Sequence, residues 1–371
     1  MKVLFIAPIP PPITGQSLAS LAFLDALRRD HSLKVINLQK EKLKQGVTSF
    51  GRIVKVSKLI RNILEQKAEA DVIYLTISQS VPGNIKDLLI YLVCFSRLSK
   101  MVIHLHGGGI RKIIFDKHPL LRWVNAFFLK RVAVVIVLGE SLAPIFREMV
   151  RKEKIYVVPN FADDDLFSPK EVVTRKYEKT YPLKVLFLSN LIPGKGHEEL
   201  LSAYKVLGKN TQEKMAIEFA GDFESEEQKK TFLEKIVGEK GISYHGVVSG
   251  NDKKQLLADA HVFCLPTYYP FEGQPISILE AYAAGCVVIT TDHGGISDIF
   301  TDGWNGYFVE KKSSSSICRM LKKLADMREQ ELLDIAIHNR TTAGEKYKAD
   351  RYVYQMTDIL ENLYRGKKQF L

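Results

Sequence analysis

Two glutamates, Glu272 and Glu280, lie around the start of a predicted helix, where their carboxylates could bind hydroxyl groups. They belong to the segment FEGQPISILEAYAAGCVVITTDHGGISDI (271–299). Pro275 favours the first helical position, and the free N–H groups of a helix start can bind an anion. On a helix the two carboxylates would be about 80° apart, so they need not form an acid–base pair. A carboxylate that accepts hydrogen bonds from vicinal hydroxyls suits a sugar or a ribose.

A cation, Lys195, lies in a second segment of the strand–loop–helix kind, FLSNLIPGKGHEELLSAY (187–204). The loop is rich in proline and glycine, and a helix is predicted directly after the lysine. A lysine beside a helix N-terminus can bind a diphosphate, because its charge adds to that of the free N–H groups. This segment therefore predicts a diphosphate site.

Two further loops each follow a predicted strand. In HLHGGG (104–109), three glycines would let a ligand approach the backbone closely. His106 is the candidate ligand-binding residue there and His104 is the alternative, although a histidine in such a place can equally be a structural core residue. The loop PPPITGQS (10–17) follows the first strand and contains Gly15.

The elements that must position these residues are short apolar runs that alternate with helical periods. The runs are unbroken in Val, Ile, Leu and Phe, which is typical of parallel strands buried on both faces. The alternation of strand and helix occurs twice, which predicts an α/β protein of two doubly wound, Rossmann-like domains. The strand candidates are 3–8, 34–38, 71–76, 101–106, 132–139, 155–159, 183–190, 216–222, 242–248, 261–267, 286–292 and 306–309.

The domain boundaries follow from composition. Residues 1–165 form the first predicted domain and residues 183–345 the second. The polar stretch 166–182 has no clear apolar period and reads as a linker. A helix over 346–371 carries an apolar stripe at 3.6-residue spacing, and one place for it to dock is the first domain.

The charge is unevenly distributed. Residues 1–180 hold 29 Lys and Arg against 16 Asp and Glu, whereas residues 181–371 hold 24 against 26. The basic half suggests an anionic partner such as an anionic membrane or a phosphorylated lipid, or else simply a solvated basic surface. No RNP, zinc or helix-turn-helix pattern accompanies it, so we do not expect nucleic acid.

The compartment is predicted from the cysteines and the hydropathy. Cys94, Cys264, Cys286 and Cys318 form no C-x-x-C pair and lie in apolar contexts, which favours buried thiols in a reducing compartment. The start of the chain reads as a strand and a turn, not as a signal peptide. No uncharged apolar run reaches about 18 residues, so no membrane span is expected. These features predict a cytoplasmic protein.

The E-x7-E spacing of Glu272 and Glu280, with the glycines that follow it, resembles the retaining family 4 glycosyltransferases (glycosyl transferases group 1). The resemblance implies the GT-B fold, two Rossmann-like domains facing across a cleft, with a nucleotide diphosphate sugar as donor. It implies that Glu272 faces the donor sugar and that Glu280 faces the ribose. The family usually has Glu where this chain has Asp298.

The other motifs extend the resemblance. Lys195 matches the family's diphosphate-binding lysine, but Asn190 stands where an arginine is usual, and Gly15 matches the first glycine of the family's N-terminal loop. The resemblance implies that His106 is aimed at the donor sugar. The predicted catalytic residues are His106, Glu272 and Lys195, and the predicted donor-binding residues are Gly15, Asn190, Lys195, Gly273, Gln274, Pro275, Ile276 and Glu280.

No metal or other cofactor is expected, because Lys195 would supply the charge on the diphosphate. The acidic triplet at 163–165 contains a D-x-D, but in the predicted linker it reads as a solvated turn. The predicted function is a retaining, metal-independent, hexosyltransferase-type enzyme of cell-surface polysaccharide assembly, with a saccharide or lipid-linked acceptor. The alternatives are a nucleotide-sugar epimerase of the same fold and a non-catalytic sugar-binding protein.

Segment 111–131 mixes basic and large apolar residues. One interpretation is a peripheral contact with an anionic membrane, on the inner face of the cell membrane. The other is an ordinary core helix whose apolar face packs on the sheet.

Overall fold

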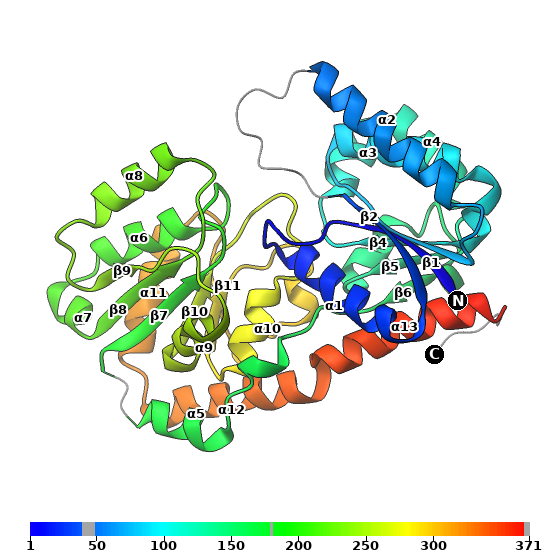
Figure 1. Ribbon diagram of the computed structural model, residues 1–371. Coiled ribbons are helices and arrows are strands. Elements are labelled where there is room, and N and C mark those ends of the chain that lie inside the picture. The colour runs from blue at the N-terminus through cyan, green and yellow to red at the C-terminus, as the bar shows by residue number, and fades with distance from the viewer. Residues whose placement is uncertain (39–48, 179–180, 367–371) are drawn as a thin grey trace. The chain divides into compact units, whose positions relative to one another are not determined.

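The computed structural model describes residues 1–38, 49–178 and 181–366. The chain divides into two compact units, of which the first comprises Met1–Asn160 with Asp350–Leu371 and the second comprises Phe161–Ala349 (Figure 1). Each unit is built around its own parallel sheet of six strands. The described segments contain no helix both long and apolar enough to cross a bilayer.

The first unit has the strand order β2-β1-β3-β4-β5-β6, with every neighbouring pair parallel. The central strands β3, β4 and β5 are buried along their whole length, as their unbroken apolar sequences predict. The strands are β1 (Lys2–Ala7), β2 (Ser32–Asn37), β3 (Val72–Thr76), β4 (Met101–Leu105), β5 (Val134–Val137) and β6 (Ile155–Val157).

Helices α1 and α3 of the first unit begin at recognisable caps, Thr14 and Ser80. Thr14 and Ser17 form a capping box, in which each side chain accepts a hydrogen bond from the other residue's backbone N–H, at 3.1 and 2.9 Å. The longer helices are α1 (Gly15–Asp30), α2 (Ser49–Gln66), α3 (Val81–Val93), α4 (Pro119–Leu129) and α13 (Ala349–Tyr364). Shorter turns are η1 (Phe95–Lys100), the π-helical η2 (Arg111–Phe115), η3 (Glu140–Ile145) and η4 (Lys152–Lys154).

The last helix, α13, packs within the first unit although it comes from the far end of the chain. Tyr352 is buried, and its hydroxyl donates to the carbonyl oxygen of Ala19 in α1 at 3.5 Å. The apolar stripe seen in the sequence of this helix is the side that turns inward, with Met356, Ile359 and Leu360 buried.

The second unit has the strand order β12-β11-β10-β7-β8-β9, again all parallel. Its strands are β7 (Leu183–Leu188), β8 (Met215–Ala220), β9 (Ile242–Tyr244), β10 (Val262–Leu265), β11 (Val287–Thr290) and β12 (Gly306–Phe308). Its helices are α5 (Lys170–Tyr177), α6 (His197–Lys205), α7 (Lys209–Glu213), α8 (Glu226–Ile236), α9 (Gly250–Asp259), α10 (Ile276–Ala283), α11 (Ser314–Ala325) and α12 (Glu329–Lys346), with short turns η5 (Asp164–Leu166) and η6 (Ile296–Asp298).

The connections of the second sheet create a topological switch point between β7 and β10. These two strands are neighbours, yet the chain leaves β7 toward β8 on one side and leaves β10 toward β11 on the other. The loops at their carboxyl ends therefore diverge, and doubly wound sheets bind ligands in the space that such loops leave. Both loops carry residues that the sequence singles out.

The predicted linker is in part a helix. Residues 170–177 form α5, in which Val173 and Tyr177 are buried and the Tyr177 hydroxyl donates to the carbonyl oxygen of His261 at 2.6 Å. Val173 and Tyr177 are one helical turn apart, and this two-residue stripe is hidden in sequence by the charged residues around it. The acidic triplet next to α5 is an exposed turn, in which Asp163 accepts from the backbone N–H of Asp165 at 3.2 Å.

The four cysteines are free and buried, as their apolar contexts predict.

Candidate functional site

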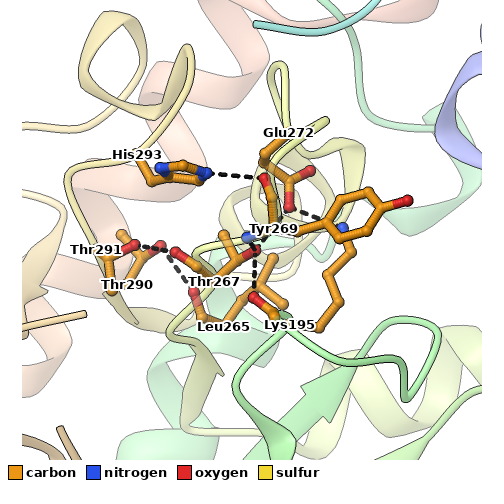
Figure 2. A network of polar contacts seen from close by, with 9 residues as sticks. Lys195, Leu265, Thr267, Tyr269, Glu272, Thr290, Thr291 and His293 are labelled. Carbon is orange, nitrogen blue, oxygen red and sulfur yellow. Dashed lines mark hydrogen bonds and ion pairs between the residues drawn. The ribbon is translucent and has the colours of Figure 1, made fainter. Parts of the chain in front are cut away.

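An ion pair joins the two loops at the switch point of the second unit. Lys195 follows β7, Glu272 follows β10, and the Lys195 Nζ lies 2.7 Å from the Glu272 Oε2 (Figure 2). The loops meet because β7 and β10 are adjacent parallel strands whose carboxyl ends share one edge of the sheet. The sequence predicts both residues at strand ends, and the structure brings them into direct contact.

The Glu272 carboxylate is nearly buried and is held from two sides. Its side chain is 8% exposed and that of Lys195 is 14% exposed. The Thr267 hydroxyl donates to the same Oε2 at 2.8 Å. Charges with so little access to water interact strongly, and removing one partner would leave the other buried without compensation. The pair is therefore a fixed feature of the loops.

Tyr269 completes the surroundings of the lysine. The Lys195 Nζ lies 5.0 Å from the centre of the Tyr269 ring, within the range of a cation–π contact. The tyrosine backbone is itself fixed, because its carbonyl oxygen accepts from the Glu272 N–H at 2.9 Å and from the His293 Nε2 at 2.8 Å (Figure 2). A carbonyl can only accept, so His293 carries a proton on Nε2.

Glycines allow the loops to approach one another. Gly196 has φ +91°, and a Cβ there would lie 2.6 Å from the carbonyl oxygen of Pro266. Gly294 has φ +61°, and its Cβ would lie 2.7 Å from the carbonyl oxygen of Glu272. Any side chain at either position would displace backbone of the site, both by contact and by strain at positive φ.

The second glutamate, Glu280, has a cation of its own. It lies inside α10, its side chain is 4% exposed, and its Oε1 is 2.6 Å from the Nζ of Lys253 in α9. Burial raises the pKa of the Glu280 carboxyl, Lys253 opposes that rise, and the charge of Asp163 adds to it. A buried carboxylate with one fixed cation can still accept hydrogen bonds from a ligand's hydroxyl groups on its free lone pairs.

In the sequence, the start of α10 lies between Glu272 and Glu280. The helix begins at Ile276, with Pro275 as its N-cap and not as its first helical residue. The N–H groups of a first helical turn have no partner within the helix, so this end is positive. Gly273 is fixed nearby, since its carbonyl oxygen accepts from the Gly295 N–H at 2.7 Å, and Gln274 is buried.

Asn190 departs from the family pattern and is an exposed residue two positions after the end of β7. The predicted site residues of the first unit are Gly15 and His106. Gly15 is the first residue of α1, directly after the capping Thr14. Each of these two belongs to a unit other than that of Lys195 and Glu272.

His106 follows β4 and lies against His104, with 3.9 Å between the ring centres. The Tyr74 hydroxyl is hydrogen-bonded to the His104 Nδ1 at 2.8 Å, whereas neither ring nitrogen of His106 has a partner among the described residues. Burial lowers the pKa of His106 to about 3. Burial, and then the neighbouring His106, holds the pKa of His104 well below its usual range. Both rings are therefore neutral near pH 7, and the fully buried His104 is a core residue.

Thr267 and Lys253 are parts of this site that the sequence did not single out. Thr267 closes the strand segment 261–267, but nothing in a lone threonine signals that it will bind a glutamate five residues later. Lys253 lies on a different helix, 27 residues before its partner Glu280, and belongs to no motif. Both contacts are tertiary.

Comparison with known proteins agrees with this geometry. A family model, Glycosyl transferases group 1, matches residues 170–340, which lie inside the second unit. These residues are thus a glycosyl transferases group 1 domain. They include Lys195, Lys253, Glu272 and Glu280.

Two curated relatives match longer stretches. A protein named as a colanic acid biosynthesis glycosyltransferase, WcaL, of Escherichia coli (strain K12) is 24% identical over 216 residues, 57% of this chain and 52% of its own length. The amylovoran biosynthesis glycosyltransferase AmsK of Erwinia amylovora is 24% identical over 281 residues, 71% of this chain and 64% of its own. The chain thus matches less than two thirds of either relative.

The crystal structure of Anabaena Alr3699/HepE in complex with UDP is 18% identical, covers 98% of this chain and 100% of that one, and has a TM-score of 0.73. This likeness shows the fold, which is GT-B with two parallel six-stranded sheets. The fold class predicted from the sequence is confirmed.

Proposed function

We propose that this chain is a retaining glycosyltransferase of the hexosyltransferase type, which moves a sugar from a nucleotide diphosphate sugar to a saccharide or lipid-linked acceptor. The observation that carries the proposal is the contact of Lys195 with Glu272 at the switch point of a glycosyl transferases group 1 domain. The names of the relatives, which refer to colanic acid and amylovoran biosynthesis, support a role in polysaccharide assembly.

In such a reaction the bond between the anomeric carbon and the β-phosphate breaks, and negative charge develops on the leaving diphosphate. A cation and aligned N–H groups stabilise that charge most when they are fixed in advance. Lys195 is fixed by Glu272 and Tyr269, and the first turn of α10 offers N–H groups. The Lys195 ammonium group has three N–H donors, so it can bind a phosphate oxygen while it keeps its bond to Glu272.

We assign the two glutamates to different parts of the donor. Glu272, in the loop that follows β10, would bind hydroxyl groups of the transferred sugar. Glu280, held by Lys253, would accept hydrogen bonds from the ribose hydroxyls. Retention of configuration and a front-face path, in which the leaving phosphate takes the proton of the acceptor hydroxyl, follow from the family resemblance. His106 remains a predicted contact of the donor sugar.

The proposal requires no metal, because Lys195 places a positive charge where another class of transferases uses a divalent ion. It also requires no other cofactor. Two alternatives make different products: an epimerase would convert one nucleotide sugar into another without an acceptor, and a sugar-binding protein would release no nucleoside diphosphate.

The first experiment is a thermal-unfolding screen of the purified chain against nucleotide diphosphate sugars. A ligand that binds only the folded protein stabilises it by about 2.7 kcal/mol at one hundred times its Kd. UDP-glucose is the first donor to test, because the structural neighbour HepE was also solved with it. Stabilisation by a nucleotide sugar, followed by release of nucleoside diphosphate with an acceptor, is the expected result. Failure of every nucleotide sugar to raise the melting temperature would overturn the proposal.

A further inference from the structure

Helices α3 and α4 of the first unit, together with the short turn η1 that follows α3, expose large apolar side chains to solvent. Each of these residues is at least 40% exposed, and together we call them the α3–α4 face: Ile85, Leu89, Leu92, Phe95, Leu120, Trp123 and Phe127. Soluble proteins commonly expose single apolar side chains, but seven on neighbouring elements form a patch of the kind that marks a binding surface.

Six of the side chains lie along two helical stripes, and Phe95 joins the stripe of α4. Ile85, Leu89 and Leu92 recur at helical spacing along α3, and Leu120, Trp123 and Phe127 do so along α4. The rings of Phe95 and Phe127 stack, with 6.1 Å between centres and 13° between planes.

The exposed stripes are not core residues left over from poor packing. The opposite sides of both helices are buried, and α3 and α4 are held in register by a reciprocal amide pair. Asn84 Nδ2 donates to Asn125 Oδ1 at 3.0 Å and Asn125 Nδ2 donates to Asn84 Oδ1 at 2.9 Å, both residues being buried. The rings of Tyr91 in α3 and Phe128 in α4 also pack against each other, with 5.8 Å between their centres. The two helices therefore each have a buried side and a second, apolar side that is exposed.

The charge around this face is mostly positive, and Glu148 pairs with two of its arginines, Arg111 and Arg122. Residues 81–131 contain nine Lys and Arg and only two acids, Asp87 and Asp116. Asp87 is buried and bound to Lys86 at 2.5 Å, and Asp116 lies 3.7 Å from Arg111. Arg131 lies on the face itself, with its guanidinium carbon 4.0 Å from the centre of the Phe127 ring. An apolar surface on a segment rich in basic residues is complementary to a lipid bilayer, which has an apolar interior and, where its lipids are acidic, an anionic surface.

We propose that the α3–α4 face rests on an anionic lipid bilayer, with its aromatic and leucine side chains in the interface and its basic residues on the lipid phosphates. Tryptophan suits this position because it is both apolar and a hydrogen-bond donor. Long basic side chains can lay their stems on the apolar surface and keep their charge among the headgroups.

The proposed membrane contact differs in position from the segment 111–131 that the sequence indicates. In segment 111–131, Ile114 and Phe115 of η2 are buried, and so are Phe128 and Leu129 of α4. Only one side of α4 is exposed, and the other half of the surface comes from α3 and η1, which the sequence did not single out. In Figure 1, these helices belong to the cyan part of the chain. The contact is a property of the first unit and does not depend on the proposed transferase activity.

The test uses the full chain with vesicles of phosphatidylcholine alone or with 30% phosphatidylglycerol added, at low and high salt. We expect sedimentation with the anionic vesicles at low salt, weaker sedimentation at high salt, and little with the neutral vesicles. Each basic residue near an anionic surface contributes about fivefold in affinity, so Lys130→Glu with Arg131→Glu should weaken binding about 25-fold or more. The matched control, Lys254→Glu with Lys322→Glu in the second unit, changes the net charge equally and should leave binding nearly unchanged.

The two tryptophans of the chain give a second readout. Trp123 is 68% exposed on the α3–α4 face and Trp304 is 65% exposed in the second unit. In Trp304→Phe, the fluorescence of Trp123 should shift to the blue when anionic vesicles are added. In Trp123→Phe, the fluorescence of Trp304 should not shift. Thermal unfolding of each variant verifies that it is folded.

Several outcomes would overturn the proposal. One is equal, negligible sedimentation with both lipid compositions. Another is binding that Lys130→Glu with Arg131→Glu does not weaken, or a blue shift from Trp304 in place of Trp123. A concentration-dependent dimer that is lost in Leu120→Ser with Trp123→Ser, without vesicle binding by the wild type, would assign the surface to a second copy of the chain instead.

Discussion

The polar side chains that follow the strands differ between the two units in their charge and in their partners. In the second unit, Lys195 and Glu272 form an ion pair, and the Thr267 hydroxyl donates to the same carboxylate. In the first unit, His104 and His106 are neutral, and the ring nitrogens of His106 have no partner among the described residues. A fixed charge suits a fixed anion, whereas an unpaired neutral ring can donate or accept as a ligand requires. The difference suggests that the second unit supplies most of the binding energy for the donor.

The largest expected effect comes from the charged pair. In Lys195→Ala, the leaving diphosphate loses its cation and Glu272 is left buried without one, so kcat/KM should fall about 100-fold, within a range of roughly 2–4 kcal/mol. Steady-state kinetics with the donor found by the thermal screen measures this. Lys205→Ala, which breaks the partly exposed pair with Glu239 in the loop after α8, is the control and should retain wild-type rates. Wild-type turnover by Lys195→Ala would rule out the proposed site.

The second effect is that of replacing Glu280. We expect the replacement to weaken donor binding and to raise the stability of the fold. Glu280→Gln should weaken donor binding about tenfold or more, because a hydrogen-bonding carboxylate is lost. The pKa of Glu280 is raised by burial, so ionisation costs the folded state stability as the pH rises through that pKa. The melting temperature of the variant minus that of the wild type should therefore be larger at pH 7 than at pH 4.

Calorimetry over this pH range, with and without donor, measures both halves of the Glu280 prediction. A variant that binds donor normally would contradict the ribose assignment. A melting-temperature difference that does not change with pH would contradict the burial argument alone.

The third effect tests whether the neutral histidine takes part. His106→Gln should lower kcat/KM about tenfold, a typical effect of one lost neutral contact and smaller than that of Lys195→Ala. Because the pKa of His106 is depressed to about 3, the fold loses stability as the pH falls from the ordinary histidine value toward 3. The melting temperature of the variant should thus rise relative to that of the wild type as the pH drops from 7 to 4. Unchanged kinetics would leave His106 a purely structural residue.

The smallest expected effect is none at all. With Lys195 supplying the charge on the diphosphate, excess EDTA should change the initial rate by less than about twofold. The assay is run with EDTA and then with added magnesium or manganese. A rate that collapses in EDTA and returns with the metal would contradict this role of the lysine and the predicted absence of a metal.

The strands were predictable from the sequence, and some of the contacts were not. Each of the twelve strand candidates overlaps a strand. The central strands were the clearest, because a parallel strand buried on both faces requires an unbroken apolar run. Lys195, Glu272 and Glu280 could be found because the glycines and helix starts beside them are local signals. The partner of Glu280 could not, because Lys253 meets it only after α9 and α10 pack together. Helix α5 was missed for a similar reason, since Val173 and Tyr177 become a buried side only in the folded second unit, where α5 packs against α12.

The bond between Lys195 and Glu272 joins residues 77 positions apart in the chain. It cannot form until β7 and β10 have paired at the centre of the second sheet, and such long-range parallel pairing is a slow event in folding. A nascent chain released before residue 272 would hold the lysine without its partner. The loop that carries Lys195 would therefore acquire its final shape only late in folding, and a donor that binds there would favour the chains that have completed this sheet.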